Sequence, residues 1–289
     1  MTRVAVLTDS SAHLPTSVIN QFGIHVIPLM VLWGTEAFRD GVDITPAEFL
    51  KRLVEDPVHP TTTQPNPEDF LLIFERLGLD YDAIVAPLIS SRLSGTVDSA
   101  QSAKASFSRV PVRVIDTQST SMGLGFAVLA AARAAAQGMS LEDIEAAARG
   151  AAASVRVLFV VDTLEYLHRG GRIGGASRLL GTAFSIKPLL HLHEGRVDAL
   201  ERVRTKAKAI NRMLTLATQY ADGQAARVAV MHAGSPEEAK ALEAQVARLI
   251  KCEELHVTEL SPALSVHTGP GTVGVAVCPL MAAGSSSGT

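Results

Sequence analysis

Cysteine is scarce in this chain, because only Cys252 and Cys278 occur among its 289 residues. The two lie far apart and belong to no Cys-x-x-Cys or Cys/His spacing, so neither a zinc site nor a disulfide framework is expected. This usage fits a reducing compartment. The first residues lead straight into an apolar run at 4–7 and do not have the layout of a signal peptide. We therefore expect a cytoplasmic protein.

Long apolar runs and an excess of charge of one sign are also missing. No uncharged apolar run approaches the roughly 18 residues that a membrane-spanning helix needs, so stable membrane insertion is not expected. The formal net charge of −3 gives no electrostatic reason to expect nucleic acid or an anionic membrane surface as a partner. With 47% hydrophobic and 19% charged residues, the chain is globular and long enough for two domains.

Several catalytic signatures are absent, including Gly-x-Ser-x-Gly, the Walker loop and His-Glu-x-x-His. The glycine-rich residues 170–175 can cradle a phosphate in principle, but they lack the Lys-Ser/Thr of a P-loop, so a structural loop is preferred. Residues 123–125, Gly-Leu-Gly, are interpreted as a helix-packing site. His191 and His193 share one face of a strand without a third ligand nearby, and exposed strand histidines are the better interpretation.

Strand and helix signals alternate in the first half of the chain. Strands are expected at 4–8, 24–32, 81–89 and 112–115, and helices at 15–22, from Thr45 onward, and at 67–77, 96–107, 121–137 and 141–154. Residues 59–67 are interpreted as a loop. Strands separated by helices of this length predict βαβ units and a largely parallel sheet.

The pattern changes after residue 154. Strands are expected at 157–161, 187–193, 196–203, 227–232, 255–260 and 272–278, and helices at 205–220 and 236–251. Glu194-Gly195 between two of these strands predicts a hairpin, so this half is not purely parallel. We expect an α/β protein with a mostly parallel, helix-flanked N-terminal domain (1–154), a mixed or antiparallel α/β C-terminal domain (155–281) and a flexible tail (282–289).

Small hydroxyl residues follow three of the expected strands, in residues 9–11, 90–96 and 116–121. Ligands bind outside the carboxyl ends of parallel strands, where a helix N-terminus also favours an anion. Taken alone, residues 90–96 are read more simply as a plain helix cap. Their repetition at three strand ends favours an anion site.

One histidine, His267, lies in a Gly/Pro-rich stretch that is interpreted as a loop before the last strand. It is either a capping donor or a site residue, and the sequence leaves both open. Hydroxyls, this histidine and scattered arginines are donors for a small anionic head group. Paired carboxylates and a nucleophile with an evident base are missing, so the residues favour binding an amphiphilic acid over chemistry on it.

A set of motifs gives this chain a resemblance to a known family. They include Thr-Thr-Thr-Gln-Pro at 61–65, Ser-Ser-Arg-Leu-Ser-Gly-Thr at 90–96, His-Arg-Gly-Gly-Arg at 168–172 and His-Thr-Gly-Pro-Gly at 267–271, with further matches at 6–11, 38–44, 114–117 and 187–190. In this order and over nearly the whole length, the chain resembles the DegV family of bacterial fatty-acid-binding proteins. These proteins are acyl carriers for a fatty acid kinase.

The resemblance implies a long-chain fatty acid, such as palmitate, stearate or oleate, buried between two domains. It implies carboxylate binding by Thr62 and Ser94, with His267 and Arg204 near the head group. Thr63 stands where many relatives have serine. Further pocket-lining or partner-facing positions follow from the same motifs: Ser10, Ser91, Gly95, Thr96, Arg169 and Arg172.

The resemblance also implies a fatty acid kinase as partner, and no catalytic residue, metal or cofactor of the carrier's own. A monomer is expected. Two other classes of function stay open at this point. One is a serine-dependent acyl hydrolase that uses Ser94 with His267 as base, and the other is a ligand-sensing regulatory protein.

Overall fold

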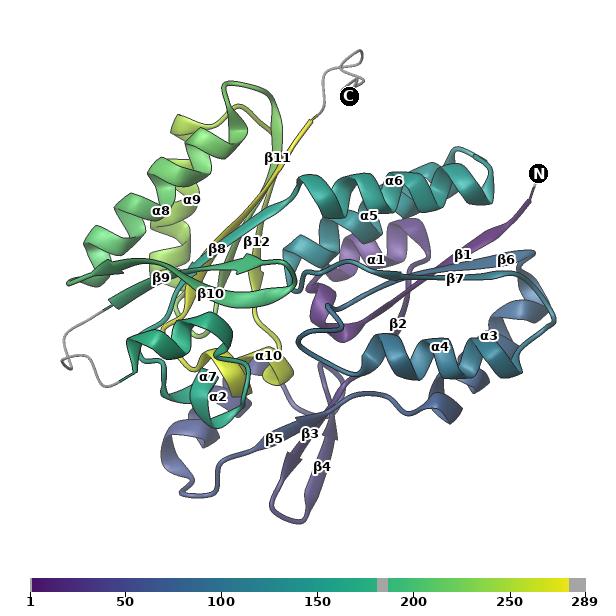
Figure 1. Ribbon diagram of the computed structural model, residues 1–289, viewed down its shortest axis with the longest axis horizontal. Helices are drawn as coiled ribbons and strands as arrows, with labels where there is room; N and C mark the ends of the chain where they lie inside the picture. The colour runs from purple at the N-terminus through teal and green to yellow at the C-terminus, as the bar shows by residue number, and fades with distance from the viewer. Residues whose placement is uncertain (1, 181–186, 281–289) are drawn as a thin grey trace.

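The computed structural model describes residues 2–180 and 187–280 and contains three β-sheets (Figure 1). The first is a four-stranded sheet in the order β2-β1-β6-β7, and all of its pairings are parallel, as predicted. Its strands are β1 (Val4–Asp9), β2 (His25–Ile27), β6 (Ala83–Leu88) and β7 (Val112–Asp116). From β1 the chain continues to β2 on one side of the sheet, and from β6 it continues to β7 on the other. A crevice for ligands is therefore expected at the carboxyl ends of β1 and β6, where the direction reverses.

Helices cover both faces of this parallel sheet. They are α1 (Thr16–Phe22), α3 (Pro67–Asp80), α4 (Thr96–Ser106), α5 (Met122–Ala136) and α6 (Leu141–Ser154). Helix α2 (Pro46–Glu55) lies apart from this sheet, with Phe49 packed against Trp33. Alternate residues of the strands reach opposite faces: Leu7 and Ile84 pack with α3 and α4, whereas Val6 and Val85 share a core with α5. The predicted helix start at Thr45 is confirmed, because Thr45 and Glu48 form a capping box.

A small antiparallel sheet was not predicted from the sequence. Its order is β4-β3-β5, with strands β3 (Met30–Trp33), β4 (Glu36–Arg39) and β5 (Thr61–Thr63). The expectation of one strand over 24–32 is wrong, because the chain leaves the parallel sheet around Pro28, which has no N–H to donate to a ladder. The predicted loop at 59–67 contains β5, which pairs with β3.

The C-terminal sheet has six strands in the order β10-β9-β8-β13-β11-β12 and is mixed, as predicted. Its strands are β8 (Arg156–Val160), β9 (Lys187–His193), β10 (Arg196–Val203), β11 (Ala226–His232), β12 (Cys252–Glu259) and β13 (Val273–Pro279). Helices α8 (Lys206–Ala221) and α9 (Pro236–Leu249) pack on one face. Shorter helical segments are η1 (Ser10–Ala12), α7 (Glu165–Arg169), η2 (Gly174–Leu179) and α10 (Pro262–Thr268).

The hairpin between β9 and β10 is confirmed and its turn reaches the N-terminal half. Glu194 and Gly195 both have positive φ, at 48° and 77°, as a two-residue hairpin turn requires. The buried Ser90 hydroxyl donates a hydrogen bond of 2.8 Å to the Gly195 carbonyl, and a Cβ at position 195 would lie only 2.4 Å from Ser90 Oγ. A buried hydrogen bond therefore joins the hairpin to the turn after β6.

One hydrophobic core continues across both halves of the chain. It includes Val6 and Leu124 from the first half together with Met231 and Ala276 from the second. Residue 154 ends α6 and the next sheet begins at Arg156, so the expected boundary falls between two elements while the core runs through it. The tail at 282–289 lies outside the described residues.

Candidate functional site

A cavity is lined by residues from both halves of the chain, and the space between its walls, its open mouth included, is about 900 Å³. Most of its wall is apolar. The apolar side chains are Leu29, Ile89, Leu93, Val157, Phe159, Leu167, Leu192, Val197, Met231, Leu260, Ala263 and Leu264. The polar side chains include Thr62, Ser94, Arg172 and His267, so three of the four residues expected at the head group line the same cavity.

Thr62 and His267 form the central polar contact of this wall. Thr62 Oγ1 lies 2.8 Å from His267 Nε2, although 205 residues separate them in the sequence. Thr62 is held in β5 by pairing with Val31 of β3, and His267 lies in the last turn of α10. The prediction of a loop around His267 is wrong, because Pro262 begins a helix that ends only at Gly269.

Burial keeps the His267 ring neutral. Burial, with the positive charges of Arg172 and His59 as lesser causes, lowers its pKa to about 3. Within the described part of the chain, its Nδ1 atom is buried and has no hydrogen-bond partner. A neutral imidazole carries one N–H, so the ring can donate one hydrogen bond, to Thr62 or to a ligand beside it, without bringing a charge of its own.

Ser94 lies in the turn after β6, and the plain-cap interpretation of residues 90–96 does not hold for its hydroxyl. The N-cap of α4 is Gly95, which makes no side-chain capping bond, while Ser94 Oγ and Thr96 Oγ1 lie 2.8 Å apart. Thr96 is buried, and Ser94 is half-buried and lines the cavity. Because the helix does not use it as a cap, the Ser94 hydroxyl retains hydrogen-bonding capacity for a ligand.

Arg172 is the arginine that lines the cavity. Its Nε donates to the Leu93 carbonyl at 3.1 Å and its Nη1 to the Gly170 carbonyl at 2.6 Å. Partial burial lowers the pKa of its guanidinium. These bonds hold a cation beside the turn that presents Ser94, so the site combines a fixed positive charge with hydroxyl donors, as an anion requires.

The glycine-rich residues 170–175 make room for their neighbours. A Cβ on Gly170 would lie only 2.0 Å from His267 Nδ1, and one on Gly174 only 2.2 Å from the Val197 carbonyl oxygen. The preferred interpretation of a structural loop agrees with this close packing. The packing interpretation of residues 123–125 is likewise confirmed, because a Cβ on Gly123 would lie 2.1 Å from Ser119 Oγ.

Other expected residues lie away from the Thr62–His267 contact. Arg204 is exposed in the bend before α8 and does not line the cavity, and exposed Arg169 pairs with Glu165. Ser91 donates a hydrogen bond to Asp116, and Ser10 donates one to Asp40. The structure therefore brings Arg172, and not Arg204, to the cavity.

His191 and His193 stack with ring centroids 5.5 Å apart and line a second, open pocket. The side chains of Val157 and Leu192 border both cavities. Across residues 2–180 and 187–280, no three His, Cys, Asp or Glu side chains gather as metal ligands. None of the helices in that part of the chain is both long and apolar enough to cross a membrane.

The hydrogen bonds do not form a nucleophile–base pair. Ser94 contacts Thr96 and His267 contacts Thr62, and among the described residues no hydrogen bond joins Ser94 to His267. A serine hydrolase needs its nucleophile within reach of the base, so this geometry gives a hydrolase no support.

The sequence did not single out most of the cavity wall. The apolar lining comes from segments throughout both halves, and no local motif marks it. Asp40, which is buried and contacts the start of α10, also went unnoticed, although it lies inside the matched motif at 38–44. A charged residue in an otherwise strand-like segment was the available signal.

Comparisons with known proteins agree on one family. The model of the family described as "Uncharacterised protein, DegV family" matches residues 3–280. A DegV domain-containing protein of Streptomyces coelicolor is 42% identical, over 95% of this chain and 98% of its own length. Two solved structures are similar over their whole length: a fatty-acid-binding DegV family protein of Thermus thermophilus (38% identity, TM-score 0.91, 96% of this chain) and DegV, a fatty acid binding protein of Bacillus subtilis (32%, 0.90, 97%).

Proposed function

Because the chain belongs to the DegV family, we propose that it binds a long-chain fatty acid in the cavity lined by Thr62 and His267 and presents the carboxylate to a fatty acid kinase. The observation that carries this proposal is the meeting of Thr62, His267, Ser94 and Arg172 in one largely apolar cavity. An apolar cavity with a few polar groups matches an amphiphile with one anionic end.

The two parts of the ligand are bound by different forces. Thr62, Ser94 and His267 hydrogen-bond the carboxylate, and Arg172 supplies a nearby positive charge. The acyl chain contributes about 0.8 kcal/mol for each buried CH₂ group, so most of the affinity comes from the tail. Palmitate, stearate and oleate are the proposed ligands.

The proposed partner is a kinase that phosphorylates the bound carboxylate. Exposed Arg169 and Arg204 are available to such a partner. The carrier itself then contributes binding and orientation, and it is proposed to act as a cytoplasmic monomer that feeds fatty acid into phospholipid synthesis.

The deciding experiment is native mass spectrometry with lipid extraction of the protein expressed in bacteria, followed by titration of delipidated protein with palmitate and oleate. We expect one co-purified fatty acid per chain and a saturable titration. Recovery of no fatty acid together with no titratable binding would overturn the proposal. Addition of a bacterial fatty acid kinase and ATP is expected to yield acyl phosphate, and failure of that step alone would remove the kinase partnership.

A further inference from the structure

Helix α10 carries a large share of the cavity wall. Its seven residues, Pro262–Thr268, include Ala263, Leu264 and His267, all of which line the cavity. So short a helix has little stability of its own, and its place is set by the core packing of Ala263 and Val266 and by the contacts at its ends. The position of the His267 ring therefore depends on what holds α10.

A buried carboxylate, Asp40, contacts the first turn of α10. The Ala263 N–H donates a hydrogen bond of 2.9 Å to Asp40 Oδ1. Asp40 lies directly after β4, is 2% exposed, and precedes Ala263 by 223 residues. It thus connects the small N-terminal sheet to the helix that presents His267. His13, also from the first half, accepts a hydrogen bond from the Ser261 N–H at 3.0 Å and supports the same end.

The second carboxylate oxygen of Asp40 accepts a hydrogen bond from Ser10. The Ser10 hydroxyl donates to Asp40 Oδ2 at 2.7 Å and accepts from the Leu29 N–H at 3.0 Å. The Asp40 N–H donates to the Leu29 carbonyl at 2.8 Å. Both oxygens are satisfied, so the carboxylate has a fixed position, and the same bonds place Leu29 in the cavity wall.

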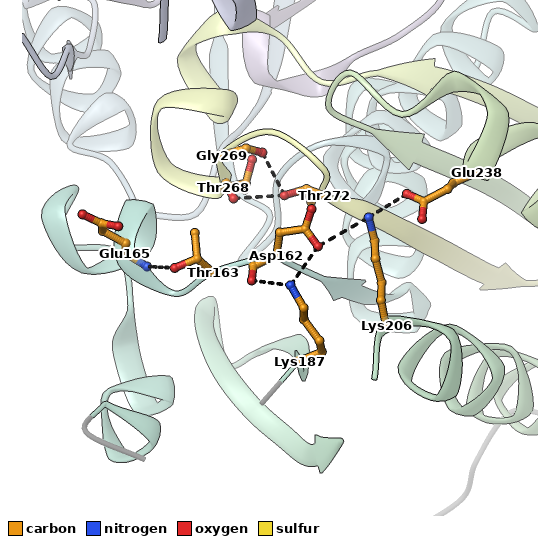
Figure 2. Close-up of polar contacts among 9 residues, drawn as sticks. All are labelled: Asp162, Thr163, Glu165, Lys187, Lys206, Glu238, Thr268, Gly269 and Thr272. Carbon is orange, nitrogen blue, oxygen red and sulfur yellow. Dashed lines mark hydrogen bonds and ion pairs between the residues drawn. The ribbon is translucent and has the colours of Figure 1, made fainter. Parts of the chain in front are cut away.

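The opposite end of α10 is held by the C-terminal half. Figure 2 shows the Thr272 hydroxyl donating to the carbonyls of Thr268 and Gly269, at 3.0 Å each. Beside them lies Asp162, which forms ion pairs with Lys187 and Lys206. A Cβ on Gly271 would lie 1.9 Å from Asp162 Oδ2, so this turn packs tightly on the carboxylate. With that end fixed, His13 and Asp40 hold the other end of α10, and Asp40 is the one that follows a strand of the small sheet to which β5 belongs.

We infer that Asp40 is a positioning residue of the carboxylate site, which holds α10 so that His267 meets Thr62 and both face the fatty acid head group. This inference rests on the proposed function. Asp40 does not touch the ligand and acts through His267.

The test compares palmitate with 1-hexadecanol, which has the same chain length and no carboxylate, by titration of delipidated protein. We expect Asp40→Ala to reduce the preference for palmitate over hexadecanol by about tenfold, the value of one well-placed hydrogen bond to a charged group. Asp40→Asn keeps an oxygen acceptor for Ala263 and is expected to lie between Asp40→Ala and the wild type. Asp43→Ala is the matched control, since exposed Asp43 in the same motif pairs with Arg39.

A double-mutant cycle with His267→Ala separates positioning from general stability. If Asp40 acts through His267, Asp40→Ala has no further effect on the palmitate preference in the His267→Ala background. An unchanged preference in Asp40→Ala, or an equal loss in both backgrounds, would overturn the inference. Asp40→Asn replaces Asp40→Ala in the cycle, under the same criterion, if the alanine variant does not fold. Absence of palmitate binding by the wild type would instead contradict the proposed function.

Discussion

The two large sheets contribute to the cavity in different ways. The parallel sheet presents the ends of its strands: residues after β6 supply Ile89, Leu93 and Ser94. The mixed sheet presents a face, on which alternate residues of β8, Val157 and Phe159, line the cavity. The alternating residues Leu158 and Val160 pack instead on the opposite side, in the core with α8.

This difference follows from the backbone of each sheet. Strand ends leave peptide groups and short polar side chains free to reorient toward a ligand, whereas a sheet face offers side chains whose backbone is fully paired. A ligand that needs both hydrogen-bonding groups and an apolar surface therefore fits between the strand ends of the parallel sheet and the face of the mixed sheet.

Removal of the hydroxyls in Thr62→Val with Ser94→Ala is expected to have the largest effect. Two hydrogen bonds to a carboxylate are lost, so palmitate affinity should fall by about 3 kcal/mol, roughly a hundredfold. Titration with palmitate measures the loss, and titration with hexadecanol should show a much smaller one. Palmitate affinity within twofold of the wild type would contradict the assignment of the head-group site.

Gly170→Ala introduces a Cβ about where the His267 ring lies, at 2.0 Å from its Nδ1 atom. Overpacking of this kind costs about 1–3 kcal/mol, and moving the ring also weakens its contact with Thr62. Denaturant unfolding and palmitate titration should both show a loss. Gly171→Ala is an imperfect control because of its positive φ, so Gly150→Ala, with open space around its Cβ, serves as the reference.

The low pKa of His267, about 3, predicts a pH dependence of stability. In the unfolded chain this histidine takes up a proton below about pH 6.5, whereas in the folded protein it stays neutral until about pH 3. As the pH falls from about 6.5 to about 3, protonation of this histidine in the unfolded chain should therefore lower the unfolding free energy of ligand-free protein by about 1.4 kcal/mol per pH unit. His267→Gln should show a shallower decline over that range, and equal slopes would contradict the assignment.

The contribution of the sheet face is tested by Leu192→Ala. Loss of contact with the acyl chain should weaken palmitate by about 1–2 kcal/mol. Because the change affects only the tail, hexadecanol should weaken by the same factor. A selective loss of palmitate affinity would show that the division between polar strand ends and apolar face is wrong.

The smallest effect is expected for Arg204→Ala. Arg204 is exposed and outside the cavity wall, so palmitate affinity should stay within about twofold of the wild type, as for most exposed substitutions. Arg172→Ala, which removes the cavity-lining arginine, should weaken palmitate severalfold. A reversed order of the two variants in palmitate titrations would return Arg204 to the head-group site.

Local patterns were sufficient for much of the fold. The capping box at Thr45, the hairpin turn at Glu194-Gly195 and the parallel order of the first sheet each depend on residues close in sequence or on a regular alternation. The misjudged elements are those where a distant partner decides. Residues 61–63 become a strand only because Val31 pairs with Thr62.

The site could be predicted only where a family motif marked its residues. Resemblance pointed to Thr62, Ser94 and His267, but the contact between Thr62 and His267 spans 205 residues and has no local signature. Taken alone, residues 90–96 indicate a helix cap, because hydroxyl residues before a helix usually are caps; here Gly95 holds that position instead. Asp40 was missed because its partners come from residues 10 and 263.

The hydrogen bond between Ser90 and Gly195 connects the contact between the two halves to the cavity. The segment that binds the hairpin through Ser90 presents Ser94 only four residues later, and Ser94 N–H itself donates to the Ser90 carbonyl at 3.1 Å. A change in this contact between the two halves is therefore expected to shift the Ser94 hydroxyl at the cavity. The contact between the halves and the candidate head-group site share one hydrogen-bonded turn.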